Sequence, residues 1–85
     1  MLLSFSDIKR LPVQTESGVQ LGYVYDCETD TGSFRVNKYY VRPNLFSTRQ
    51  YLVNVSQIKS IGGDKIVVED GILGEKTMQE PAVAE

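Results

Sequence analysis

The stretch from Pro12 to Asp30, PVQTESGVQLGYVYDCETD, constrains the fold of this 85-residue chain more than any other. Two runs of strand-forming residues flank Glu16-Ser17-Gly18, a turn whose glycine can adopt a positive φ. The strand that begins at Gln20 is therefore predicted to pair back on Pro12 to Thr15 as a hairpin.

The second run of this hairpin does not alternate regularly. Its aliphatic residues fall at Leu21 and Val24, three positions apart, which breaks the two-residue period of a strand. A bulge near Gly22 or Tyr25 restores the period, and bulges increase the twist of a strand and turn it round a corner. The pattern predicts a strongly bent sheet of the kind that curls into a small barrel.

The residues before this hairpin predict one helical turn. Ser4 and Asp7 have the spacing of a capping box, with Asp in place of Glu, so a turn is expected over about Ser4 to Arg10. Pro12 ends it, because the residue before a proline is driven out of the helical region.

A second hairpin turn is predicted at Thr29 to Gly32, with Asp30 accepting from the local backbone and Gly32 in the left-handed region. The following strand, Ser33 to Arg42, is rich in aromatic and β-branched residues and stops at Pro43 and Asn44. The loop that follows, Leu45 to Arg49, is expected to expose Phe46 at its tip.

The last third of the chain continues in short elements. Tyr51 to Val55 is predicted as a nearly fully buried strand. Ser56 to Ile61 is predicted as a capped turn that places one isoleucine in the core, and Lys65 to Glu69 as the last strand. Together these segments predict an all-β fold: a small, strongly bent barrel of about five to six strands with one or two short helical turns.

The pattern decays beyond Asp70, where neither a helical face nor a strand continues. We therefore expect one domain over residues 1–74 and a flexible C-terminal tail over residues 75–85.

The composition argues against several kinds of active site. Histidine is absent and cysteine occurs once, at Cys27, which excludes an internal disulfide, makes a metal cluster unfavourable and leaves the thiol without a base. Asp26, Glu28 and Asp30 alternate along one strand, as a cation site or an acid-base pair requires, but a solvated strand face has the same pattern. No catalytic, cofactor-binding or metal-ligating residue is assigned, and we expect a protein that is not an enzyme.

Charge and hydropathy bear on where the protein acts. The net charge is −2, which provides no global attraction to nucleic acid or anionic lipid. The N-terminus has neither a basic region nor a long apolar run, and no segment approaches 18 apolar residues. We expect a cytoplasmic protein without membrane insertion.

One group of side chains has the composition of a binding surface, because basic residues alternate with aromatic ones. Tyrosine and arginine are enriched at protein interfaces, and the same residues can hold single-stranded RNA by stacking and phosphate contacts. Core tyrosines surrounded by the stems of cations are a third interpretation. The interface candidates are Arg35, Lys38, Tyr39, Tyr40, Arg42, Phe46, Arg49 and Tyr51.

The hairpin signature and the downstream turn and strand together resemble the PRC-barrel domain. The matching positions are Pro12-Val13, Thr15, Gly18, Leu21-Gly22, Val24, Asp26, Asp30, Leu52 to Val55, Ser56, Ile58, Ile61-Gly62 and Ile66-Val67-Val68.

This domain occurs in the reaction-centre H subunit and in the C-terminal half of a ribosome maturation factor. The resemblance implies a bent barrel of about six strands that works as a binding module, with no catalytic residue to carry over. Stand-alone copies include some associated with cell division or sporulation.

We therefore expect a stand-alone adaptor that acts through protein-protein contacts with a partner of unknown identity, as a homodimer or within a larger assembly. The alternative is an RNA- or ribosome-associated factor that uses the strand from Arg35 to Arg42.

Overall fold

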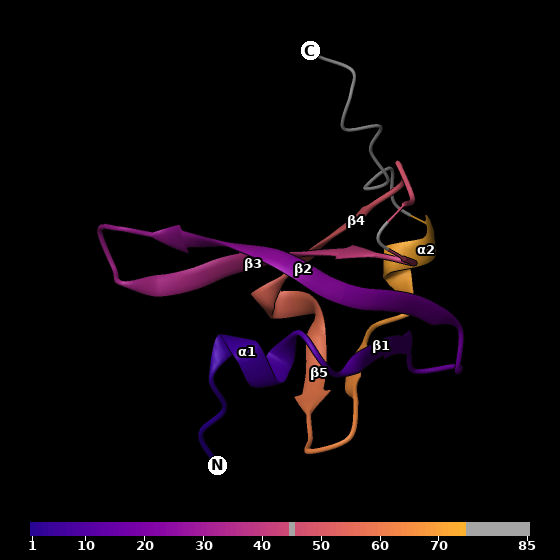
Figure 1. The fold of residues 1–85 in the computed structure, drawn as a ribbon, viewed down its shortest axis with the longest axis horizontal. Helices are drawn as coiled ribbons and strands as arrows, with labels where there is room; N and C mark the ends of the chain where they lie inside the picture. The colour runs from indigo at the N-terminus through magenta and orange to yellow at the C-terminus, as the bar shows by residue number, and fades with distance from the viewer. Residues whose placement is uncertain (45, 75–85) are drawn as a thin grey trace.

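The computed structural model describes residues 1–44 and 46–74 (Figure 1). In chain order its elements are α1 (Phe5–Ile8), β1 (Pro12–Thr15), β2 (Gln20–Asp30), β3 (Arg35–Arg42), β4 (Tyr51–Asn54), the 3-10 turn η1 (Val55–Gln57), β5 (Ile58–Ile61), β6 (Ile66–Val68) and α2 (Gly71–Gly74). The predicted all-β class is confirmed.

The six strands of the described chain form one mixed sheet in the order β4-β3-β2-β1-β6-β5. The pairing of β1 with β6 is parallel and the other four pairings are antiparallel. Figure 1 shows β5 running at a steep angle to the long β2–β3 ribbon, with β1 alongside β2, so the sheet bends round its core in a barrel-like way. β4 and β5 are its two edges.

The helical turn α1 begins at the predicted capping box. The Asp7 backbone N–H donates to Ser4 Oγ at 3.1 Å, and the Ser4 N–H donates to Asp7 Oδ2 at 3.1 Å. These contacts satisfy two N–H groups that a helix start leaves unpaired. Ile8, at the end of the turn, is buried.

The first hairpin forms as predicted. Gly18 has φ 98°, and its N–H donates to the Thr15 carbonyl at 2.9 Å. Thr15 is fully buried, and its Oγ1 accepts from the Val19 N–H at 3.1 Å. The buried hydroxyl therefore stabilises the turn from inside.

Irregularities occur at both positions expected to break the alternation of β2. Gly22 has φ 124°, and the β1–β2 register shifts beside it, between Val13 and Gln14. The β2–β3 register shifts again between Val24 and Asp26, where Tyr25 is the extra residue. Both breaks lie in the strand that crosses the bend of the sheet.

The second hairpin differs in one detail from its prediction. Asp30 Oδ1 accepts from the Gly32 N–H at 2.9 Å, as expected. The left-handed residue, however, is Phe34 with φ 63°, not Gly32. Because the turn extends through Phe34, β3 begins at Arg35, two residues later than predicted.

Two predictions for the last third are wrong. Ser56 to Ile61 is not one capped turn: η1 occupies Val55–Gln57, and Ile58–Ile61 is a strand because it pairs with β6. β4 is not nearly fully buried, since only Val53 of its four residues is buried. As an edge strand it covers the core with one face alone.

The core lies on the inner face of the bend. Its buried apolar residues are Ile8, Leu11, Val13, Leu21, Val24, Tyr39, Val41, Val53, Ile66, Val68 and Ile72. Ile72 comes from α2, a turn that the sequence pattern did not reveal. The predicted domain boundary at residue 74 and the predicted tail fall on residues 75–85, which lie outside the described residues.

No described helix has the length and hydropathy needed to cross a lipid bilayer.

Candidate functional site

The alternation of β3 separates the candidate residues into two groups. Tyr39 and Val41 face the core, with 9% and 1% of their surfaces exposed. Lys38, Tyr40 and Arg42 occupy the intervening positions and therefore face outward. Tyr39 is consequently a core residue in the free protein.

Cross-strand pairing extends this outward group over three strands. Tyr23 of β2 lies opposite Arg42, and Leu52 of β4 lies opposite Tyr40. Directly opposed residues of an antiparallel pair share one face of the sheet. We call this surface the tyrosine face, and its members are Tyr23, Tyr25, Lys38, Tyr40, Arg42 and Leu52.

Arg42 and two tyrosines form a continuous row on the tyrosine face. The Arg42 guanidinium carbon lies 4.0 Å from the centroid of the Tyr25 ring, a cation-π contact. The Tyr25 and Tyr40 ring centroids are 6.1 Å apart with their planes tilted by 46°. The row therefore presents flat aromatic surface beside a fixed positive charge.

A carboxylate ends this row. Glu28 Oε2 accepts from the Tyr40 hydroxyl at 3.4 Å, and Glu28 Oε1 lies 3.7 Å from Lys38 Nζ. Glu28 thus neutralises Lys38, while the Arg42 side chain has no ion pair or hydrogen bond with the described residues.

The tyrosines of the row have raised pKa values. Burial raises the pKa of Tyr25, against the opposing effect of the Arg42 charge. Burial also raises the pKa of Tyr40, and the neighbouring Glu28 carboxylate adds to this. Both hydroxyls are therefore protonated at neutral pH.

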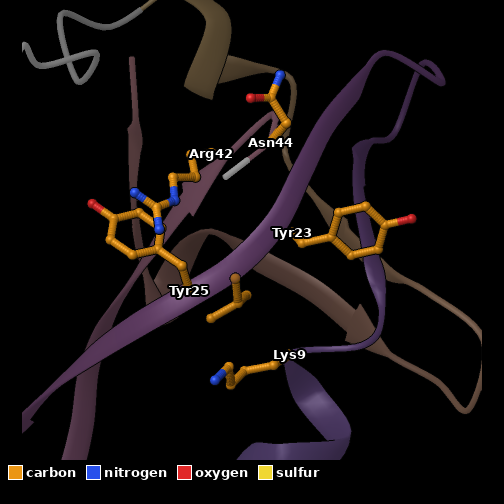
Figure 2. Close-up of a pocket in the computed structure, with 6 residues that line it drawn as sticks. Lys9, Tyr23, Tyr25, Arg42 and Asn44 are labelled. Carbon is orange, nitrogen blue, oxygen red and sulfur yellow. The ribbon is translucent and has the colours of Figure 1, made fainter. Parts of the chain in front are cut away.

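A pocket of about 350 Å³ opens at the Arg42 end of the tyrosine face (Figure 2). It is lined by Lys9, Tyr23, Val24, Tyr25, Arg42 and Asn44. Figure 2 shows the Tyr25 ring against Arg42, with Tyr23 on the other side of β2. Lys9 reaches the pocket from the end of α1, and Asn44 from the segment after β3.

Gly22 allows the backbone to come together beside this pocket. A Cβ at position 22 would overlap the Arg42 carbonyl oxygen, and would lie 2.5 Å from the Arg42 carbonyl carbon and 2.7 Å from Pro43 Cα. Glycine at this position lets β2 lie against the end of β3, and so fixes the backbone that carries Arg42.

Besides Tyr39, four predicted interface residues lie outside the tyrosine face. Arg35 is exposed at the hairpin end of β3, opposite Asp30. Phe46 is 93% exposed, as expected, and Arg49 is exposed in the same loop. Tyr51 is partly buried and packs against the core.

Sequence reasoning missed four residues of the pocket: Lys9, Tyr23, Tyr25 and Asn44. Two of them carried a signal. Val24 is an aliphatic residue of this strand, so simple alternation places its neighbours Tyr23 and Tyr25 on the face opposite to its own. Lys9 and Asn44 reach the pocket only because of the tertiary fold, and no sequence pattern indicated them.

The carboxylates of β2 have separate partners. Asp26 Oδ1 accepts from the Cys27 N–H at 2.8 Å, Glu28 joins the row, and Asp30 holds the hairpin turn. In residues 1–44 and 46–74, no three His, Cys, Asp or Glu side chains gather as a metal ion requires. Cys27 is half-buried against the core.

The chain matches a known protein family. The family model of the PRC-barrel domain covers residues 2–72, which include the six strands of the described chain and the whole tyrosine face. Curated proteins yielded no match.

Proposed function

Because this chain belongs to the PRC-barrel domain family, a family of small binding modules, we propose that it is a non-enzymatic adaptor that binds a partner protein through the tyrosine face. The observation that carries the proposal is the Arg42–Tyr25–Tyr40 row, whose guanidinium group and rings lie side by side on the outward face of the sheet. Tyrosine and arginine supply much of the binding energy at protein interfaces, and tyrosine buries a large area at a low cost in conformational entropy.

Neighbouring residues complete such an interface. Leu52 adds apolar area beside Tyr40, and Tyr23 is 48% exposed beside Arg42. Lys38 and Glu28 form a charged margin. This arrangement of an apolar and aromatic centre with a polar rim is typical of protein-binding surfaces.

The experiment is affinity capture with the full chain from extracts of the native host, followed by mass spectrometry. Tyr40→Ala removes the centre of the row. Val19→Ala removes exposed apolar area, 43% exposed, from the β1–β2 turn and serves as the matched control. Thermal unfolding of both variants verifies that they fold.

We expect a protein that wild type and Val19→Ala retain and Tyr40→Ala loses. Equal retention by all three proteins, or no retained protein, contradicts the proposal.

We further propose that the protein assembles with a second copy through a sheet edge. β5 is an edge strand, so part of its backbone lacks a neighbouring strand. Beside it lies an apolar hollow of about 420 Å³ lined by Met1, Leu2, Leu3, Ile8 and Ile61. Sedimentation equilibrium should give a dimer, and a strictly monomeric species at high micromolar concentration contradicts this.

RNA is a weaker candidate for the tyrosine face. Lys38 is paired with Glu28, and Asp26 lies opposite Tyr40, so carboxylates accompany the cations. These carboxylates repel phosphate groups and so weaken the attraction of the cations for RNA. Titration of a labelled single-stranded RNA at low and high salt separates the two functions, since RNA binding must weaken as salt rises.

A further inference from the structure

The pocket at the Arg42 end of the tyrosine face contains two cations without a carboxylate partner in the described chain. Lys9 Nζ lies 5.7 Å from the centroid of the Phe5 ring and forms no ion pair there. Arg42 contacts the Tyr25 ring and likewise forms none. The two described salt bridges involve Lys38 and Lys59, outside the pocket.

Arg42 is held in place before any ligand arrives. The Tyr25 ring lies against its guanidinium group, and its backbone is fixed by the close approach of Gly22. Its Nε is buried and has no hydrogen-bond partner among the described residues. A fixed guanidinium loses little conformational entropy on binding, which favours recognition of a planar carboxylate.

The other lining residues favour the same class of ligand. Asn44 Oδ1 accepts from the Phe46 N–H at 2.9 Å, so the Asn44 amide NH₂ group is the part that remains to donate. Tyr23, Val24 and Tyr25 provide apolar walls. The carboxylate of Asp26, on the same face, is not part of the lining and accepts from the Cys27 N–H.

We propose that this pocket binds an acidic segment of the partner protein. One carboxylate of the segment pairs with Arg42 and a second with Lys9, while an apolar side chain between them packs on the tyrosine rings. The pocket volume, about 350 Å³, is at the small end of the range of ligand sites and suits a few side chains. The inference rests on the proposed function, since it specifies the chemistry of the partner.

The test is an NMR titration of the ¹⁵N-labelled full chain at pH 7 and low ionic strength. The probe is the capped peptide acetyl-Gly-Glu-Val-Asp-Gly-amide, and the control is acetyl-Gly-Gln-Val-Asn-Gly-amide. We expect the acidic peptide alone to shift the amide signals of Lys9, Tyr23 to Tyr25, Arg42 and Asn44. Added salt should weaken the binding, because the charges are solvent-accessible.

Matched variants locate the binding. Arg42→Gln should weaken the acidic peptide about 5- to 10-fold and Lys9→Gln about 2- to 5-fold. The controls are Arg35→Gln, at the other end of β3, and Arg10→Gln, which follows Lys9 but does not line the pocket. Both controls should leave the affinity within about 2-fold.

The inference is overturned if the two peptides bind equally, if neither binds, or if Arg35→Gln weakens binding as much as Arg42→Gln. Glutarate in place of the peptide tests for a free small dicarboxylate, and tighter binding of glutarate overturns the assignment to a protein segment.

The experiments distinguish failure of the pocket inference from failure of the proposed function of the tyrosine face. Tyr40 does not line the pocket, but its ring lies 6.1 Å from that of Tyr25, which does, so Tyr40→Ala should abolish capture of the partner while it weakens peptide binding less than Arg42→Gln does. If capture depends on Tyr40 but the peptide does not bind, only the pocket inference fails. If the peptide binds but capture ignores Tyr40, the proposed function fails and the carboxylate site stands.

Discussion

Replacing Gly22 with alanine should destabilise the fold severely, for two separable reasons. The residue has φ 124°, a conformation that costs an L-residue about 1 to 3 kcal/mol. The new Cβ would also overlap the Arg42 carbonyl oxygen and lie 2.7 Å from Pro43 Cα. These neighbours are backbone atoms, which a rotamer change cannot move, so the overlap must be relieved by shifting β2 from the end of β3.

The size of the effect follows from these two terms. Backbone shifts forced by overpacking cost about 1 to 3 kcal/mol, so the total destabilisation should be about 2 to 6 kcal/mol. Small domains have only about 5 to 15 kcal/mol of stability. The unfolding midpoint should therefore fall by at least about 8 °C, since each kcal/mol shifts it by about 4 to 8 °C at this chain length.

Two further glycines make a controlled series, measured by urea and thermal unfolding with circular dichroism. Gly18 has φ 98° but nothing within 4 Å of the position of its Cβ, so Gly18→Ala should cost only about 1 to 2 kcal/mol. Gly63 has neither constraint, and Gly63→Ala should stay within about 0.5 kcal/mol of wild type. The reasoning is refuted if Gly22→Ala loses no more stability than Gly18→Ala.

Three other perturbations are predicted. Phe34→Asn should raise stability by about 1 kcal/mol, because the left-handed Phe34 is 86% exposed and asparagine tolerates this conformation; Phe34→Ala should show no gain in the same urea titration. Thr15→Val should lower stability by about 1 to 3 kcal/mol, measured by chemical denaturation, because the Val19 N–H loses its acceptor; a neutral result would show that water replaces the hydroxyl. The Ser17 backbone N–H holds the pKa of Asp70 below its usual 3.8. The Asp70 carboxylate therefore contributes folding stability that is fully present above pH 3.8 and is lost as the pH falls through the lowered pKa. Asp70→Asn should flatten the acid side of the stability curve between about pH 5 and 2, and an unchanged acid limb would refute this linkage.

Local chemistry explains why the start of the chain was predictable. The Ser4–Asp7 capping box, the Gly18 turn and the irregularities at Gly22 and Tyr25 involve residues close together in the sequence. Their geometry depends on backbone φ preferences and on short-range hydrogen bonds. The same signals supported the PRC-barrel resemblance, which the family match confirms.

Two of the errors have different physical origins. Ile58 to Ile61 resembles a capped turn locally, but pairing with β6 makes it a strand. Phe34 is left-handed although Gly32 is nearby, because the closing contact runs from the Phe34 N–H to the Asp30 carbonyl at 2.8 Å. The first error therefore comes from a tertiary pairing, and the second from a local turn that is longer than the predicted one.

The sequence alone therefore determined the class of fold, the first hairpin, the places where β2 breaks and the tyrosine-arginine composition of the surface. Tertiary structure decided which side chains of that composition face outward: alternation in β3 turned Tyr39 to the core and left Tyr40 and Arg42 on the tyrosine face. It also brought Lys9 from α1 beside Arg42, 33 positions away in the chain. A pocket between distant elements depends on how the sheet bends. Residues that only this bend brings together leave no local pattern in the sequence.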